Sequence, residues 1–165
     1  MQKLEVFGAS KLKGQINISG SKNASLPILA ATLLSKKRIS LKNLPKVKDI
    51  ETMLVLLESL GSKIKKIKDK IIIDNSSQKK TFASYNLVKT MRAGILVLGP
   101  LLAKFGKARV SSPGGCSIGV RPIDIHLRAL QKLGAKIKIS QGYVIASAPD
   151  GLVGSKIHFS KVSVG

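Results

Sequence analysis

The residues best suited to chemistry lie in a glycine-rich stretch past the middle of the chain. Cys116, the only cysteine, lies in the loop of residues 113–119, five residues before Arg121. The glycines permit close approaches that a side chain would block, so a ligand could bond to the N–H groups of the loop. A single cysteine is most often a small buried apolar residue, and a glycine-rich turn is most often only a turn. A thiol in such a loop, followed by an arginine, nevertheless predicts an anion-binding site with a reactive thiol.

The elements that must position this loop belong to an internal repeat. One helical pattern carries apolar residues on one face and ends at Gly61, and a second pattern of the same kind ends at Gly134. The offset from 61 to 134 is 73 residues, and the same offset joins Leu54 to Leu127. A constant offset indicates a duplicated unit. In each copy the glycine caps the helix, and the alternation that follows predicts a strand.

Each copy predicts the order strand, helix, strand, helix, strand, strand. In the first copy we expect the first helix over residues 26–34, the second strand over residues 39–41 and the hairpin over residues 62–74. In the second copy we expect the first helix over residues 87–103, the second strand over residues 109–111 and the hairpin over residues 135–147. Residues 156–165 parallel the strand-to-helix junction at residues 15–22 and indicate the opening of a third copy. A chain that stopped there would leave a strand edge and an apolar face uncovered, so we expect a truncated gene product.

The composition fits one packed domain and excludes several functions. At 165 residues and 44% apolar content the chain can build a core. One cysteine cannot form an internal disulfide, and two histidines without a CxxC pair do not predict a metal site. The N-terminus does not resemble a secretory signal, and the longest apolar stretch, residues 94–103, is too short to cross a bilayer. We therefore expect a soluble, cytoplasmic protein without a membrane partner.

The net charge of +21 has two interpretations. Clustered cations would suit a nucleic-acid partner, because they release counterions from phosphates. Here most basic residues are lysines scattered along the chain, which favours solvated faces, so we do not expect nucleic-acid binding. A basic cleft would also steer small anionic substrates.

Five short segments form a distinctive combination, namely residues 20–24, 89–93, 113–119, 121–126 and 161–165. Together they resemble the UDP-N-acetylglucosamine enolpyruvyl transferases. The resemblance runs from about residue 4 to residue 165, and it is specific as a combination although each motif alone is weak. It implies an inside-out α/β barrel of two lobes, each made of three βαβαββ units, with the third unit incomplete here. Residues 1–21 would belong to a mostly missing C-terminal lobe, and residues 22–165 to the N-terminal lobe.

The resemblance also implies a reaction and a set of site residues. The enolpyruvyl group of phosphoenolpyruvate would pass to the 3-hydroxyl of UDP-N-acetylglucosamine, with release of phosphate and without a metal or cofactor. Cys116 would donate a proton and be the target of fosfomycin, with Lys22 and Arg121 also catalytic. Lys22 and Asn23 would bind phosphoenolpyruvate. The UDP-N-acetylglucosamine site would consist of Arg92, Arg121, Pro122, Ile123, Asp124, Ile125, Lys161, Val162, Ser163 and Val164.

Other interpretations of the chain stay open. A 5-enolpyruvylshikimate-3-phosphate synthase would share the fold and the phosphoenolpyruvate chemistry, although the loop containing Cys116 and the residues from Arg121 to Asp124 argue against it. A non-catalytic basic protein that binds anions or nucleic acids is another alternative. Because the catalytic base and further arginines of the family would lie beyond residue 165, we expect no measurable turnover from this chain alone.

Overall fold

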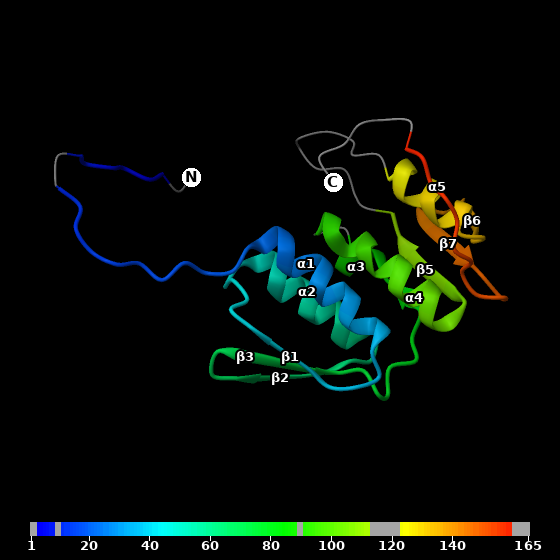
Figure 1. The fold of residues 1–165 in the computed structure, drawn as a ribbon, viewed down its shortest axis with the longest axis horizontal. Helices are drawn as coiled ribbons and strands as arrows, with labels where there is room; N and C mark the ends of the chain where they lie inside the picture. The colour runs from blue at the N-terminus through cyan, green and yellow to red at the C-terminus, as the bar shows by residue number, and fades with distance from the viewer. Residues whose placement is uncertain (1–2, 9–10, 89–90, 113–122, 160–165) are drawn as a thin grey trace.

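The computed structural model describes residues 3–8, 11–88, 91–112 and 123–159. Figure 1 shows the helices from α1 (Lys22–Ala31) to α4 (Leu98–Phe105) grouped together, with one sheet below them and the other sheet and α5 (Asp124–Lys132) to their right. The alternation of helices and strands confirms the predicted α/β class. Closure into an inside-out barrel and the division at residue 21 stay predictions.

The first unit runs from residue 22 to residue 74. It contains α1 (Lys22–Ala31), the 3-10 helix η1 (Thr32–Leu34), β1 (Ile39–Lys42), α2 (Lys48–Ser59), β2 (Lys63–Ile67) and β3 (Lys70–Asp74). The three strands form an antiparallel sheet in the order β1-β3-β2. In this sheet Ile39, Ile64 and Ile73 share one register row. Side chains in one row point to the same face of a sheet, so these isoleucines face the core, where Ile73 is fully buried.

The second unit follows in the same order. It contains β4 (Phe82–Ala83), α3 (Tyr85–Val88), the 3-10 helix η2 (Arg92–Val97), α4 (Leu98–Phe105), β5 (Lys107–Ser111), α5 (Asp124–Lys132), β6 (Lys136–Ser140) and β7 (Tyr143–Ser147). Its sheet has the order β4-β5-β7-β6, with β4 parallel to β5 and the other pairs antiparallel. The predicted order of strand, helix, strand, helix, strand, strand is therefore confirmed in this unit.

Backbone geometry confirms the duplication. The N–H of Gly61 donates to the carbonyl of Glu58 at 2.9 Å, and the N–H of Gly134 donates to that of Gln131 at 2.9 Å. Both glycines have positive φ, 103° and 93°, which allows the chain to leave each helix in the left-handed conformation. The hairpin turns also match, since Lys68 and Gln141, 73 residues apart, have φ values of 51° and 50°.

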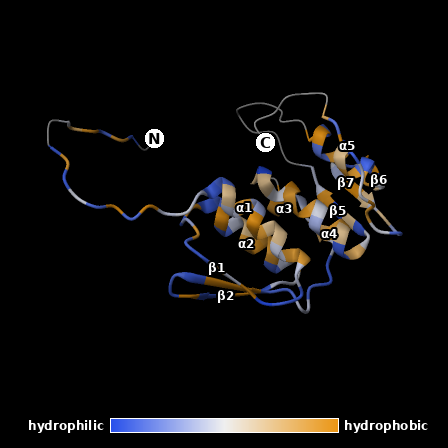
Figure 2. Cartoon of the chain, in the orientation of Figure 1, coloured by the Kyte–Doolittle hydropathy of each residue, from blue (hydrophilic) through white to orange (hydrophobic). Residues whose placement is uncertain are grey.

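The core is aliphatic and lies between the helices and the inner faces of the sheets. Figure 2 shows apolar residues concentrated on α1, α2 and α4. The largest fully buried side chains are Leu29, Leu33, Met53, Leu56, Leu57, Leu60, Ile73, Leu98, Leu101, Leu102, Val88 and Val97. One connected cluster of buried residues includes members of both units. The two units therefore share one core.

The predicted helix over residues 87–103 is wrong as a single element. It is divided into α3, η2 and α4. The extended Met91 (φ −144°, ψ 116°) separates α3 from η2, whereas η2 continues directly into α4. Gly94 then lies so close to α3 that a Cβ there would be 3.0 Å from Cγ1 of Val88. Helix α1 begins four residues before the predicted start at residue 26, because Ser21 caps it.

Two predicted strands are not formed in the described residues. Residues 11–21 form no strand, and their apolar side chains lie in solvent, as the 98% exposure of Leu12 and the 86% exposure of Ile18 show. Figure 1 shows this segment leading away from α1 as an extended arm. Residues 152–159 likewise form no strand. A strand needs a partner for its backbone groups, and the sequence pattern alone does not supply one.

Candidate functional site

The start of α1 presents two of the predicted site residues, Lys22 and Asn23. The helix begins there because Ser21 is extended and its hydroxyl accepts a hydrogen bond from the N–H of Ala24 at 3.3 Å. Ser25 reinforces this end by donating its hydroxyl to the carbonyl of Ser21 at 2.7 Å. The cap places Lys22 in the first turn, where free N–H groups and the helix dipole favour an anion.

The ammonium of Lys22 forms an ion pair with a residue that the sequence analysis did not single out. Its Nζ lies 2.9 Å from Oδ2 of Asp49, in the first turn of α2. Both side chains are partly exposed, at 49% and 38%, so solvent screens the pair. An ammonium has three donors, and one contact with Asp49 leaves others for an anionic ligand. Asp49 therefore fixes the direction of Lys22 without occupying all of its donors.

The junction before α1 is fixed by a close backbone contact. The N–H of Gly20 donates to Oδ1 of Asn43 at 3.1 Å. A Cβ at position 20 would overlap the main-chain carbonyl oxygen of Asn43. Asn43 itself has a φ of 56°, a left-handed conformation that asparagine tolerates better than most residues. Only glycine fits at position 20 without moving the chain two residues before Lys22.

Arg92 begins η2 and is half-buried. Helix η2 packs against α1, so Arg92 belongs to an element next to the one that carries Lys22. Asn23 is exposed one residue after Lys22.

The start of α5 carries Ile123, Asp124 and Ile125, all partly buried. Oδ1 of Asp124 and Nε2 of His126 are both buried and have no hydrogen-bond partner among the described residues. Burial also lowers the pKa of His126, because it disfavours the imidazolium form. An unpartnered buried polar atom costs about 1–3 kcal/mol, so each such atom is expected to have a use. Two such atoms at this end of α5 support a polar ligand here.

The remaining predicted site residues lie outside the described residues. They are Cys116, Arg121, Pro122, Lys161, Val162, Ser163 and Val164. Their contribution to a common site stays a prediction. Within the described ranges, the structure joins α1 to α2 through Lys22 and Asp49, and it places Arg92 on a neighbouring element.

The repeat does not point to Asp49. The offset of 73 residues takes Asp49 to Pro122 and takes Asp124 to Glu51, although Asp49 and Glu51 both lie in the first turn of α2. A carboxylate in the first turn of a helix is stabilised by the helix dipole, so the position of Asp49 alone did not indicate that it pairs with Lys22. The contact between Gly20 and Asn43 had no sequence signal, because it joins residues in different elements.

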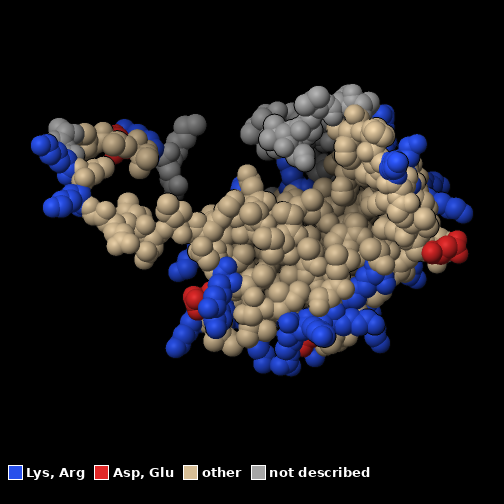
Figure 3. Space-filling model, viewed as in Figure 1, with Lys and Arg blue, Asp and Glu red and all other residues tan. Residues whose placement is uncertain are grey.

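The described residues contain no group of three or more His, Cys, Asp or Glu side chains that could hold a metal ion. Within the same residues, helices long and apolar enough to cross a membrane are absent. Figure 3 shows lysine and arginine along several edges of the face in view, including the edge next to β1, β2 and β3.

Comparison with known sequences gives both a family and individual relatives. The family model for EPSP synthase (3-phosphoshikimate 1-carboxyvinyltransferase) matches residues 6–165. The UDP-N-acetylglucosamine 1-carboxyvinyltransferase of Pelagibacter ubique is 75% identical over 165 residues, which are 100% of this chain and 40% of that protein. The protein of the same name from Aliarcobacter butzleri is 53% identical over 100% of this chain and 39% of its own length. The chain therefore spans about 40% of the length of the curated relatives it matches.

Solved structures share the fold. The enolpyruvyl transferase NikO from Streptomyces tendae superposes with a TM-score of 0.73 at 19% identity, covering 88% of this chain and 32% of NikO. EPSP synthase from Acinetobacter baumannii gives a TM-score of 0.67 at 16% identity, covering 92% of this chain and 35% of that protein. At these identities the likeness concerns the fold alone. Because the family model covers almost the whole chain, the chain belongs to the EPSP synthase family, which is named after a 3-phosphoshikimate 1-carboxyvinyltransferase.

Proposed function

We propose that this chain is the amino-terminal part of an enzyme that transfers the enolpyruvyl group of phosphoenolpyruvate to the 3-hydroxyl of UDP-N-acetylglucosamine. The observation that carries the proposal is the 75% identity, across every residue of the chain, to a UDP-N-acetylglucosamine 1-carboxyvinyltransferase. Identity to the EPSP synthase structure is only 16%. This contrast favours UDP-N-acetylglucosamine over shikimate 3-phosphate as the acceptor.

The proposed reaction proceeds by addition and then elimination. The sugar hydroxyl loses its proton and bonds to C2 of phosphoenolpyruvate, while the methylene carbon C3 gains a proton from Cys116. The tetrahedral intermediate then loses a proton from C3 and releases phosphate, which restores the double bond. Phosphate and carboxylate charges persist throughout, so preorganised cations are the expected catalytic device. In this proposal a metal or an organic cofactor has no role.

The position of Lys22 supports its proposed role. Its side chain is half-exposed, stands at the start of α1 and is directed by Asp49. A phosphate there would contact both the ammonium and the free N–H groups of the helix end. Asn23 would hydrogen-bond the reacting groups, and Arg92 and Arg121 would hold phosphate or carboxylate oxygens.

The nucleotide-sugar is proposed to contact the start of α5 and the end of the chain. Pro122, Ile123, Asp124 and Ile125 would line this site, with the buried Oδ1 of Asp124 accepting from a ligand N–H or hydroxyl. Residues 161–164 would complete it. A second lobe, absent here, would supply the catalytic base and take up residues 1–21. The 165-residue chain alone is therefore expected to be inactive.

We extend the proposal to the setting of the enzyme. The reaction would be the first committed step of peptidoglycan precursor synthesis and would take place in the cytoplasm, supporting cell-wall biogenesis, cell shape and division. Fosfomycin would alkylate Cys116. Alkylation needs the thiolate while proton donation needs the thiol, so both forms must be accessible.

The test supplies the missing part from a relative. Residues 1–165 are fused to the rest of the Pelagibacter ubique protein, and this fusion is named the joined protein. Phosphate release is measured with phosphoenolpyruvate and either UDP-N-acetylglucosamine or shikimate 3-phosphate. We expect release only with UDP-N-acetylglucosamine and none from the 165-residue chain.

Two controls sharpen this test. Cys116→Ser in the joined protein should lose turnover while it still binds UDP-N-acetylglucosamine. Cys116→Asp keeps a proton donor but removes the fosfomycin target, so it separates the need for a proton from the need for sulfur. Release with shikimate 3-phosphate alone, or steady release from the 165-residue chain, would overturn the proposal.

A further inference from the structure

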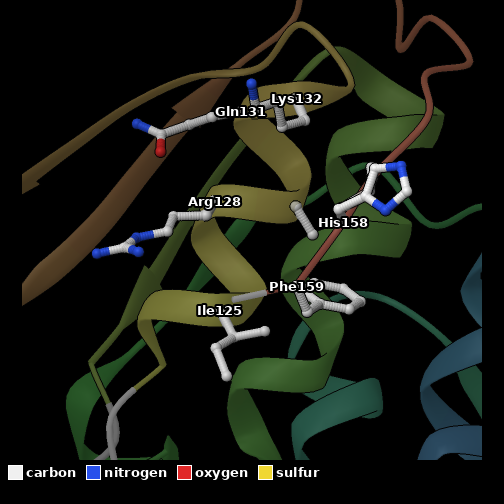
Figure 4. A pocket seen from close by; sticks show the side chains of 8 residues that line it. Ile125, Arg128, Gln131, Lys132, His158 and Phe159 are labelled. Carbon is white, nitrogen blue, oxygen red and sulfur yellow. The ribbon is translucent and has the colours of Figure 1, made fainter. Parts of the chain in front are cut away.

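Two grooves of the described residues differ in the side chains that line them. The first, shown in Figure 4, lies between α5 and the segment that follows β7, and it is lined in part by Ile125, which the proposed nucleotide-sugar site already uses. The second has a volume of about 470 Å³ and lies beside β4, so we name it the β4 groove. Its lining includes Lys79, Lys80, Thr81, Phe82, Ser84 and Lys107.

The β4 groove carries an unbalanced positive charge. Three lysines line it, and among the described residues no carboxylate does. By contrast, the groove beside the turn between β2 and β3 contains Glu51 and Asp69 among its lysines. The ion pairs in the described part of the chain use Lys3, Lys22 and Arg38, so none of them neutralises an ammonium group of the β4 groove. Unpaired cations around a hollow favour an anionic ligand.

Strand β4 adds hydrogen-bond donors to these charges. It stands at the edge of its sheet, where only β5 is its neighbour in the strand order. The N–H of Arg109 donates to the carbonyl of Thr81 at 2.9 Å, so the backbone groups of Thr81 face β5. Alternate residues of a strand direct these groups to opposite sides, and the N–H of Phe82 therefore points away from β5. Backbone N–H groups at a sheet edge, together with the hydroxyls of Thr81 and Ser84, suit phosphate oxygens.

The ring of Phe82 gives the groove an aromatic surface. Cζ of Arg109 lies 5.2 Å from the centre of this ring and 4.4 Å from the centre of the Tyr143 ring, and the two rings are 5.6 Å apart. These contacts hold Phe82 in place on the sheet, yet the residue remains 46% exposed. A fixed and exposed aromatic ring is a surface on which a nucleic-acid base can stack.

We propose that the β4 groove binds a nucleoside polyphosphate, with the base on Phe82 and the phosphates on Lys79, Lys80 and Lys107. Its volume lies within the range of about 300–1,000 Å³ that is usual for small-molecule sites. The binding of such an anion requires no residue of the proposed enolpyruvyl transfer.

The β4 groove is separate from the candidate site around Lys22. Ser59, which also lines the groove, is the last residue of α2, whereas Asp49, the partner of Lys22, lies in the first turn of that helix. Ten residues of helix at a rise of about 1.5 Å each place the two positions about 15 Å apart. Lys107 is the first residue of β5, and the loop with Cys116 follows the other end of that strand. The proposed ligand is therefore not a substrate of the proposed reaction.

The experiment titrates the 165-residue chain with ATP at about 0.15 M salt, and backbone-amide NMR both locates the binding and measures its affinity. We expect shifts in residues 79–84 and at Lys107. The double variant Lys80→Gln/Lys107→Gln should weaken binding by about tenfold or more, because each lysine donates to a charged group. Lys13→Gln/Lys65→Gln is the matched control, since it removes the same charge from two exposed lysines outside the groove, and it should change the affinity by less than about twofold.

A second comparison tests the stacked base. ATP should bind about fivefold or more tightly than inorganic triphosphate, and Phe82→Leu should abolish this preference. Phe159→Leu, at another exposed phenylalanine, should preserve it.

Three results would overturn the proposal. The first is equal weakening by the two lysine double variants, which would show attraction to the net charge alone. The second is a set of shifts centred on residues 20–24 instead of the groove, which would assign the anion to the start of α1. The third is equal affinity for ATP and inorganic triphosphate, which would exclude a role for the base. Because these readouts measure binding and not turnover, they are independent of the proposed reaction.

Discussion

Gly20→Ala is the perturbation that most sharply connects the fold with the proposed site. A Cβ at position 20 would overlap the carbonyl oxygen of Asn43, which is a main-chain atom and cannot rotate away. The two segments must then separate by on the order of 1 Å, and a misplacement of that size can cost about 10²-fold in rate. Lys22 lies two residues further along, so the shift is expected to reach its ammonium.

Stability should change less than activity. The substitution adds an overpacked contact, which typically costs about 1–3 kcal/mol. The low end applies here, because residues 11–19 are exposed and can move with the junction. For a chain of this size about 1 kcal/mol corresponds to a fall in Tm of roughly 2–4 °C. Thermal unfolding of the 165-residue chain, followed by circular dichroism, measures this fall in Tm.

Activity is measured as kcat/KM for phosphoenolpyruvate in the joined protein. Gly14→Ala is the matched control, because a Cβ there would have nothing within 4 Å. We expect a loss of about 10²-fold for Gly20→Ala and no change for Gly14→Ala. If Gly20→Ala keeps kcat/KM within about twofold of the unmodified joined protein, the reasoning that this contact positions Lys22 is refuted.

Three further predictions concern the stability of the 165-residue chain. Leu57→Ala, at a fully buried position, should cost about 2–5 kcal/mol in urea unfolding, whereas Val55→Ala, at a position 48% exposed, should cost at most about 0.5 kcal/mol; equal losses would contradict the described core. Hydrogen bonds from Ser76, together with Arg38, lower the pKa of Asp74, so its contribution to folding stability is present at neutral pH and declines as the pH falls below the ordinary pKa of 3.8. Asp74→Asn should therefore lower Tm at pH 7, and the difference in Tm should shrink in acid. A difference in Tm that is independent of pH would argue against this contribution. Burial lowers the pKa of His126 below 6.5, so on acidification the unfolded chain takes up a proton before the folded chain does, and stability falls from pH 7 to pH 5. His126→Gln should reduce this dependence of stability on pH. An unchanged dependence would show that another group causes it.

The repeat was the most predictable part of the molecule, because it depends on local rules. Helix-capping glycines, turn residues and alternating strands act within a few residues, so the hairpins at residues 62–74 and 135–147 were correctly placed. The division of residues 87–103 was missed, because the extended Met91 and the packing of Gly94 on Val88 depend on tertiary contacts. The strands expected near residues 15–18 and 156–159 did not form for a related reason, since the sequence pattern of a strand does not specify the strand with which it pairs.

The candidate site was predictable as a set of residue types but not as a set of contacts. Lys22, Asn23 and Asp124 could be singled out from motifs at helix starts, and the structure places all three in the first turns of α1 and α5. The partner of Lys22 lies 27 positions away on another helix. Such a pairing follows from the packing of α1 against α2, which the sequence does not specify directly.

The most direct test of the central claim follows the enolpyruvyl group itself. The joined protein is incubated with isotopically labelled phosphoenolpyruvate and an equimolar mixture of UDP-N-acetylglucosamine and shikimate 3-phosphate, and the products are separated and identified by mass spectrometry. We predict that the label appears as an enol ether on UDP-N-acetylglucosamine, with the transfer abolished by Cys116→Ser. Label on shikimate 3-phosphate alone, or on neither acceptor while both substrates bind, would contradict the claim.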